Sequence, residues 1–109
     1  MDKVNTIIKK LNTFRDERNW KQFHTPQNLA KSIVLEASEL LENYQYVTLQ
    51  TPNVENVKEE LADVMAYCLM MIDYYGFDFE TMMHEKIDKN AEKYPAKTFY
   101  GNAKKYNDQ

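Results

Sequence analysis

"EELADVMAYCLMMI", residues Glu59–Ile72, sets three acidic residues directly before the longest uncharged apolar run of the chain. From Val64 to Ile72 there is no charged residue. A helix that is apolar on nearly every side is normally buried, at the centre of a bundle or at a subunit interface. Carboxylates beside such a segment raise the question of what offsets their charge, because burial disfavours the ionised form.

The composition is that of a soluble globular chain of 109 residues, 43% hydrophobic and 28% charged. This length corresponds to one domain over residues 1–109. Two glycines and three prolines are too few for many tight turns, so a few long helices are favoured. A formal net charge of −3 provides no basic field for nucleic acid. The single Cys68 provides neither a disulfide framework nor a Cys-based zinc site.

The beginning of the sequence, "MDKVNTIIKK", lacks the apolar core of a signal peptide. No segment reaches the apolar length of a membrane span. We therefore expect a cytoplasmic protein that makes no membrane contact.

The spacing of apolar residues predicts an all-α fold, a four-helix bundle. The four helices are expected at about residues 3–18, 26–44, 54–75 and 79–93. In a chain this small, the apolar third helix is expected to be covered by self-association, as a homodimer or homotetramer.

Local signals set the ends of these helices. Thr25 followed by Pro26 is a hydroxyl cap and a first-position proline, which together start the second helix. Gly76 is expected to end the third helix and Asp78 to cap the fourth. Pro95 stops the fourth helix, and the tail from about residue 95 is expected to be irregular.

Two pairs of acids share one spacing. Glu36 and Glu39 lie three residues apart on the edge of the second helix's apolar stripe, and Glu60 and Asp63 repeat this on the third. Two helices in contact would bring four carboxylates into one small volume, where unit charges 4 Å apart repel by about 4 kcal/mol at intermediate dielectric. A divalent cation with hard oxygen ligands removes that repulsion, so the pattern indicates Mg²⁺, with Mn²⁺ as the alternative ion. A single pair of acids at this spacing usually just lies on the solvent-exposed face of a helix and binds no metal.

A ferritin-like di-iron site is excluded by the histidines. Such sites need a histidine three residues after a glutamate. The two histidines are His24 and His84, and neither has a glutamate at that position.

Aromatic and polar residues supply candidates for a nucleotide pocket. Aromatic faces stack on nucleobases, although the same residues could simply pack the connector between helices. A lysine–asparagine face on the fourth helix could meet a triphosphate, although lysine stripes are usually solvated. The candidates are Trp20, Phe23, His24, Asn28 and Tyr46 for the base, and Lys86, Asn90 and Lys93 for the triphosphate.

The segments "LEASEL" and "EELADV" together resemble the ExxE…ExxD signature of the MazG-like all-α nucleoside triphosphate pyrophosphohydrolases. Within that family the chain is most similar to the branch that contains the dCTP pyrophosphatases. The similarity also includes "ERNWKQFHTPQNL" and "KIDKNAEKYP", and it extends from about Phe14 to Pro95.

This resemblance implies a magnesium-dependent enzyme that cleaves a nucleoside triphosphate, dCTP or a related deoxynucleotide, between the α- and β-phosphates. It implies nucleotide-pool sanitation or control as the cellular role. By motif position the metal ligands are Glu36, Glu39, Glu60 and Asp63, with Glu39 favoured to orient the attacking water. The substrate-contacting positions implied are Trp20 to His24, Tyr46 and Tyr67.

Three positions depart from the family pattern. Leu35 stands where many members have a further glutamate before the first motif acid. In the dCTP-specific branch, Tyr46 replaces a frequent tryptophan and Leu11 replaces a histidine. The four motif acids are intact, and these departures leave the preferred base open.

Two other classes of function compete with the enzyme. The chain could be a helical oligomer that binds nucleotide without hydrolysing it, or an interaction protein whose Met-rich third helix binds a protein partner. Nucleotide binding alone does not need four paired acids, and the interaction reading leaves them unexplained. The sequence therefore favours the enzyme.

Overall fold

The computed structural model describes residues 2–45 and 52–102, and these residues form helices and no strand. The all-α prediction is confirmed, and the four long helices lie within one residue of their expected bounds. The chain divides into two compact units, residues 1–76 and 77–109, and each is considered by itself. The helices are α1 (Lys3–Glu17), η1 (Lys21–Phe23, a 3₁₀ turn), α2 (Pro26–Gln45), α3 (Val54–Tyr75), α4 (Phe79–Lys93) and α5 (Ala96–Phe99).

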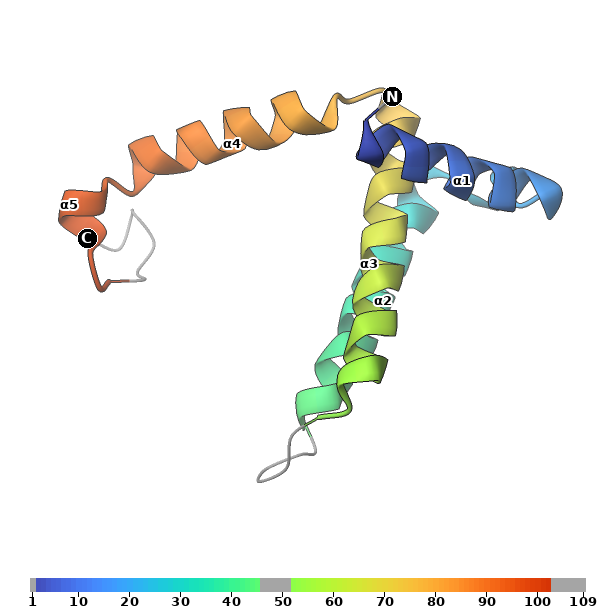
Figure 1. The fold of residues 1–109 in the computed structure, drawn as a ribbon, viewed down its shortest axis with the longest axis horizontal. Helices are drawn as coiled ribbons and strands as arrows, with labels where there is room; N and C mark the ends of the chain where they lie inside the picture. The colour runs from blue at the N-terminus through green and yellow to red at the C-terminus, as the bar shows by residue number, and fades with distance from the viewer. Residues whose placement is uncertain (1, 46–51, 103–109) are drawn as a thin grey trace. The chain divides into compact units, whose positions relative to one another are not determined.

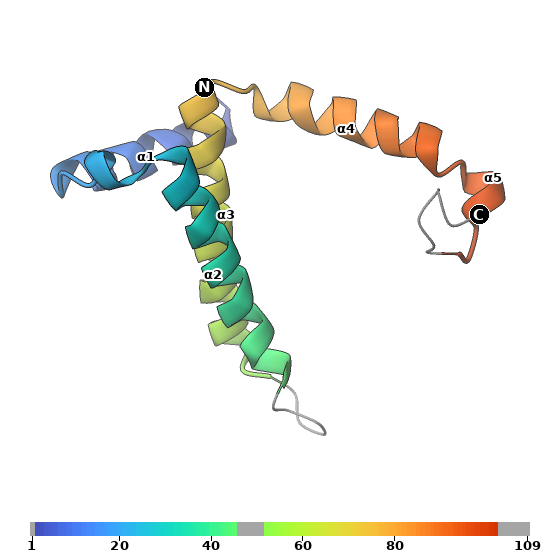
Figure 2. The same cartoon turned by 180° about the vertical axis from the view of Figure 1, so that it is seen from behind.

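In the first unit, α2 and α3 run antiparallel side by side, and α1 crosses α3 near its C-terminal half (Figures 1 and 2). The side chains that hold these helices together are few. Among the described residues the buried hydrophobic side chains are Ile8, Leu29, Leu69 and Ile72, of which Leu29 is only 2% exposed. This small core fixes the faces that α2 and α3 turn toward each other.

Side-chain caps explain where the helices begin. Asn53 starts α3, since its side-chain oxygen accepts hydrogen bonds from the backbone N–H groups of Glu55 and Asn56. Thr25 accepts a bond from the backbone N–H of Asn28 at 3.2 Å, as expected for the cap of α2. Asp78 caps α4 by accepting bonds from the Thr81 backbone N–H at 3.0 Å and hydroxyl at 2.7 Å.

The ends of α3 and α4 show one success and one error of the sequence prediction. Gly76 ends α3 in the left-handed conformation, with φ of 70°, as predicted. The tail was expected to be irregular, but Ala96–Phe99 forms the short helix α5. Pro95 stops α4 and then serves as the N-terminal flanking residue of α5, so a residue that ends one helix also starts the next.

The apolar helix α3 is covered on one side by its own chain. Leu69 and Ile72 are buried, whereas Leu61 and Met65 are 47% and 44% exposed. The neighbours α1 and α2 cover part of the helix surface, and Leu61 and Met65 lie on the part that they leave exposed. Within the described residues, no helix combines the length and the apolar character needed to cross a membrane.

Candidate functional site

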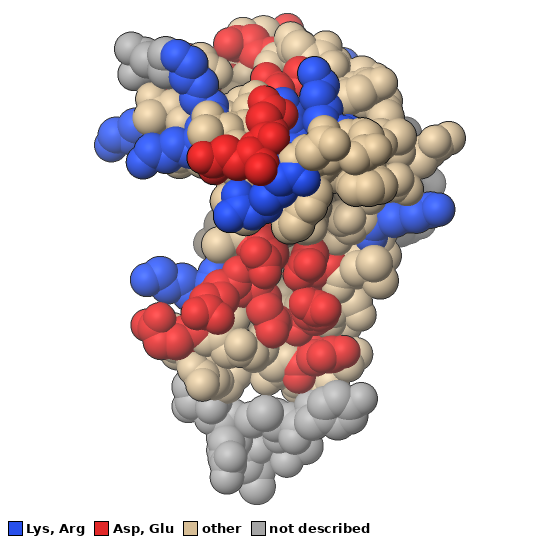
Figure 3. All heavy atoms as spheres, turned by 90° about the vertical axis from the view of Figure 1, so that its right-hand side faces the viewer, with Lys and Arg blue, Asp and Glu red and all other residues tan. Residues whose placement is uncertain are grey.

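Four carboxylates from two helices gather in one region of the first unit. Glu36 and Glu39 project from α2, and Glu60 and Asp63 project from α3. Burial first, then the adjacent Glu39 carboxyl and the charges of Asp63 and Glu60, raise the pKa of Glu36. Figure 3 shows acidic side chains gathered on the lower part of the face in view.

The Glu36 carboxyl has the features expected of a cation ligand. Its Oε2 atom is buried and has no hydrogen-bond partner, which is costly for an oxygen that carries negative charge. Oxygens of this kind are the ligands that Mg²⁺ prefers. Among the described residues, no three His, Cys, Asp or Glu side chains stand close enough to hold a metal ion without rearrangement. For the four acids to share a cation, Glu36, Glu39 and Asp63 therefore have to rotate towards Glu60.

Glu60 is held by two amides. Asn43 on α2 donates from Nδ2 to Glu60 Oε2 at 2.8 Å, and Asn56 on α3 donates from Nδ2 to Glu60 Oε1 at 3.1 Å. The Asn56 Nδ2 also donates to Asn43 Oδ1 at 2.9 Å. These bonds fix the plane of the Glu60 carboxylate and join α2 to α3.

Asp63 also lines a pocket of about 250 Å³, so the acids and the pocket meet at this residue. The pocket lies between α1, the connector and α3. Aromatic rings form part of its wall, which suits a flat ring ligand. The other lining residues are Leu11, Phe14, Trp20, His24, Ala66, Tyr67 and Met70.

His24 is a half-buried polar group in this wall. Its ring meets Tyr67 edge to face, with centroids 6.4 Å apart. Burial, with a smaller contribution from the positive charge of Arg15, lowers the pKa of His24, so its imidazole is neutral at pH 7. Its Nδ1 atom is buried and without a hydrogen-bond partner, which leaves it free to bond a ligand.

The other two aromatic candidates of the connector, Trp20 and Phe23, differ in whether they line the pocket. Trp20 lines the pocket and packs edge to face on Phe14, with centroids 5.8 Å apart. Phe23 is 58% exposed and is not a lining residue. Its carbonyl accepts a bond from Asn28 Nδ2 at 2.9 Å, so Asn28 here secures the turn before α2.

Four further candidates are not tested by these contacts. Tyr46 lies outside the described residues. Lys86 and Asn90 lie on α4, in the second unit, where both are exposed. Their contact with a triphosphate stays a prediction, as does that of Lys93.

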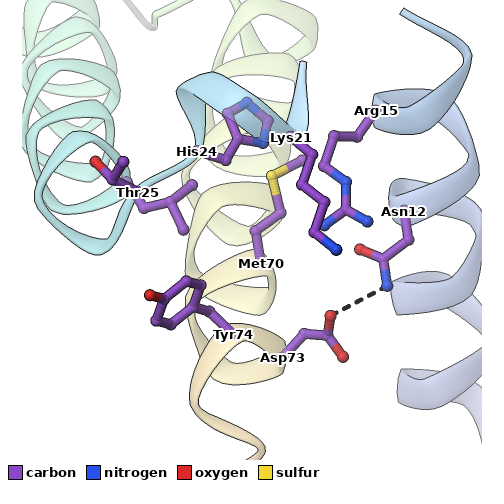
Figure 4. Close-up of a pocket in the computed structure, with 9 residues that line it drawn as sticks. Asn12, Arg15, Lys21, His24, Thr25, Met70, Asp73 and Tyr74 are labelled. Carbon is purple, nitrogen blue, oxygen red and sulfur yellow. Dashed lines mark hydrogen bonds between the residues drawn. The ribbon is translucent and has the colours of Figure 1, made fainter. Parts of the chain in front are cut away.

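A second, larger pocket of about 550 Å³ lies on the other side of His24 and Met70, which line both pockets. Figure 4 shows Arg15 and Asn12 reaching in from α1 and Lys21 reaching in from the connector. Asn12 Nδ2 donates to Asp73 Oδ2 at 3.1 Å and joins α1 to α3. The lining is of mixed charge, and none of the four acids lines it.

Sequence reasoning missed several residues that the fold brings to the site. Phe14 and Met70 looked like ordinary core positions, because each lies in an apolar helical stripe. Asn43 and Asn56 had a weak signal in the sequence, since they stand four residues after Glu39 and four before Glu60. At that spacing a polar side chain shares a helix face with the motif acid.

The all-α fold agrees with the resemblance of the sequence to the MazG-like family. Residues 31–108 match that family, and the chain belongs to it. A similar solved structure is a pyrophosphatase from Archaeoglobus fulgidus, 35% identical, with a TM-score of 0.77 over 87% of this chain and 94% of that one.

Curated relatives are similar as well. The dCTP pyrophosphatase 1 proteins of Rattus norvegicus and Homo sapiens are each 33% identical, over 87% and 85% of this chain. The aligned region spans 61% and 59% of those two relatives, so this chain covers less than two thirds of their length.

The raised pKa of Glu36 leads to a prediction on pH and stability. The folded chain holds the Glu36 proton more tightly than the unfolded chain, so ionised Glu36 destabilises the fold above its folded pKa. That penalty decreases as the pH falls and is absent below the ordinary value of 4.5. Glu36→Gln should therefore raise the melting temperature at pH 7 to 8 in chelator, and should have no such effect below pH 4.5.

Thermal unfolding followed by circular dichroism across this pH range tests the prediction. Glu42→Gln is the matched control, because Glu42 is an exposed residue of the same helix and the substitution removes the same charge. Equal shifts for the two variants at every pH would show that Glu36 carries no special electrostatic penalty.

Proposed function

We propose that this chain is a magnesium-dependent nucleoside triphosphate pyrophosphohydrolase that releases a nucleoside monophosphate and pyrophosphate. One observation carries the proposal: Asp63 belongs to the four acids and also lines the aromatic pocket. A nucleotide whose base lies in that pocket has its phosphates beside the acids. Membership of the MazG-like family and the similarity to named pyrophosphatases support the same activity.

The acids fit the ion that this family uses. Glu36 supplies a buried oxygen without a hydrogen-bond partner. Further carboxylates, close enough to interact electrostatically with Glu36, come from Glu39, Glu60 and Asp63. Mg²⁺, or Mn²⁺ in its place, supplies charge neutralisation on the phosphates and a water of lowered pKa when bound.

The protein's own part in the reaction is to position substrate and to accept a proton. Glu39 is the exposed member of the α2 pair, so water can reach it. Its carboxylate is placed to accept a proton from the attacking water as the phosphoanhydride bond breaks. The water oxygen bonds to the α- or β-phosphorus. The bond to the bridging oxygen breaks, and its electron pair stays on that oxygen in the departing pyrophosphate or monophosphate.

The base is proposed to stack against the aromatic wall formed by Trp20 and Tyr67. Leu11 lines this pocket and offers no hydrogen bond, so polar discrimination depends on His24 and the Tyr67 hydroxyl. dCTP is the first candidate substrate, because the curated relatives are named dCTP pyrophosphatase 1. A wholly non-catalytic nucleotide-binding oligomer is the alternative.

Product analysis by chromatography tests the reaction. The purified protein is given a panel of ribo- and deoxynucleoside triphosphates with magnesium or with chelator. We expect monophosphate and pyrophosphate with magnesium only, and a loss in kcat of roughly 10²- to 10⁴-fold for Glu39→Gln. Glu42→Gln should keep its activity.

The outcomes separate the competing functions. Diphosphate and orthophosphate as products would contradict the proposed cleavage position. Saturable nucleotide binding without turnover, in a folded protein, would favour the non-catalytic oligomer. The triphosphate with the highest kcat/KM identifies the base that the pocket prefers.

The aromatic wall leads to a second prediction. Stacking of a base on an aromatic side chain contributes about 1–3 kcal/mol. Trp20→Ala should therefore lower kcat/KM by roughly 5- to 150-fold, because that is the same free energy expressed as a ratio. Tyr44→Ala is the control, since Tyr44 is 51% exposed and lines neither pocket described above. Equal activities for the two variants would remove Trp20 from the binding site.

We further propose that the chain acts as a homodimer or homotetramer. Val34 and Leu35 on α2 are 68% and 64% exposed, and they line an apolar groove of about 450 Å³ together with Ala30 and Lys31. Leu61 and Met65 add exposed apolar surface on α3. An exposed apolar groove of this kind marks an interaction site.

Light scattering coupled to size-exclusion chromatography measures the assembly. We expect a mass of two or four chains, and Val34→Lys should shift it toward one chain by placing a charge in the groove. Glu42→Lys, a change at another exposed position of α2, serves as the control. A single-chain mass for the unaltered protein would contradict the proposed assembly.

A further inference from the structure

Glu60 differs from the other three acids in how it is held. Within the part of the chain that the structure describes, it is the member of the four whose two carboxylate oxygens both accept bonds from side-chain amides. The donors are Asn43 Nδ2 at 2.8 Å and Asn56 Nδ2 at 3.1 Å. With both oxygens engaged, the carboxylate cannot rotate without breaking a hydrogen bond.

The two amides also support each other. Asn56 Nδ2 donates to Asn43 Oδ1 at 2.9 Å, so the Asn43 side chain accepts one bond and donates another. The Asn43 Nδ2 also donates to the carbonyl of Leu40 at 3.1 Å, one turn earlier on α2. The amide group of Asn43 is therefore fixed by its own helix before it reaches across to α3.

Neutral amide donors have a particular consequence for a cation ligand. An amide orients a carboxylate without cancelling its charge, whereas a lysine or arginine at the same place would compete with the cation. Each carboxylate oxygen has a second lone pair and can still coordinate an ion. Residues that hold a metal ligand in this way commonly change metal affinity or activity by 10- to 100-fold when altered.

We propose that Asn43 and Asn56 are positioning residues that hold the Glu60 carboxylate in the orientation in which it binds the divalent cation. The inference rests on the proposed function, since it concerns a ligand of the same cation. Asn43 acts from α2 and Asn56 acts from α3, so the pair also sets the distance of Glu60 from Glu36 and Glu39.

Calorimetric titration with magnesium alone, in the absence of nucleotide, tests this role separately from turnover. Asn43→Leu should raise the magnesium dissociation constant by roughly 10- to 100-fold. In the hydrolysis assay the same variant should need correspondingly more magnesium for half-maximal activity. At saturating magnesium, its KM for nucleotide should stay close to that of the unaltered chain.

Asn12→Leu is the matched control. Asn12 also joins two helices through an amide-to-carboxylate hydrogen bond, from its Nδ2 to Asp73 Oδ2 at 3.1 Å. It lies outside the four acids and does not line the aromatic pocket. The control variant should lose a similar amount of thermal stability and keep its magnesium dissociation constant.

Asn56→Ala keeps the test decisive if Asn43→Leu does not fold. Asn56 is exposed, and alanine favours the helix, so this variant should fold. It leaves the bond from Asn43 to Glu60 in place and removes the donor to Glu60 Oε1. We expect a smaller but measurable loss of magnesium affinity.

Magnesium affinities equal to that of the unaltered chain, in Asn43→Leu and Asn56→Ala alike, would overturn the inference and leave the amides as a helix-joining contact. That outcome is distinct from a failure of the proposed function. If the unaltered chain neither binds magnesium nor hydrolyses any triphosphate, the proposed function fails, and this inference fails with it.

Discussion

The packing of α2 against α3 is the constraint on which the rest of the first unit depends. It sets the pairs Glu36–Glu39 and Glu60–Asp63 against each other, close enough for three negative charges to raise the pKa of Glu36. A small core around Leu29 holds this arrangement. Because the helices pack through apolar faces, their acidic edges meet whether or not the charges favour it.

The same packing aligns the acids with the pocket. One turn of α3 separates Asp63 from Tyr67, and both line the pocket that the connector closes with Trp20 and His24. The helix thus presents charge at one end of the site and an aromatic surface at the other. This order of groups matches the order of phosphate and base in a nucleotide, which is why the acids and the pocket are interpreted as one site.

The features that the sequence predicted correctly are local ones. Caps such as Thr25, Asp78 and Gly76 act within a few residues, so helix ends follow from short patterns. The i, i+3 spacing of the acids is local as well. The short helix α5 was missed, because a single turn has little periodicity for a sequence pattern to reveal.

The features that the sequence did not predict depend on how helices rotate against each other. Asn43 and Asn56 reach Glu60 only because α2 and α3 meet in one particular register. Phe14 reaches the pocket because α1 crosses α3 near the connector. A single helical pattern carries no information on such cross-helix contacts.

The closeness of the four acids both destabilises their ionised forms and favours the binding of a cation. Carboxylates that raise the pKa of a neighbour also attract a cation, and a cation that binds the folded chain alone stabilises it by mass action. Glu36 must lose its proton to act as a ligand, so cation binding and deprotonation are linked. The apolar run after Asp63 gives these acids a rigid support. A flexible support would let the carboxylates separate, and both the repulsion and the binding site would then be lost.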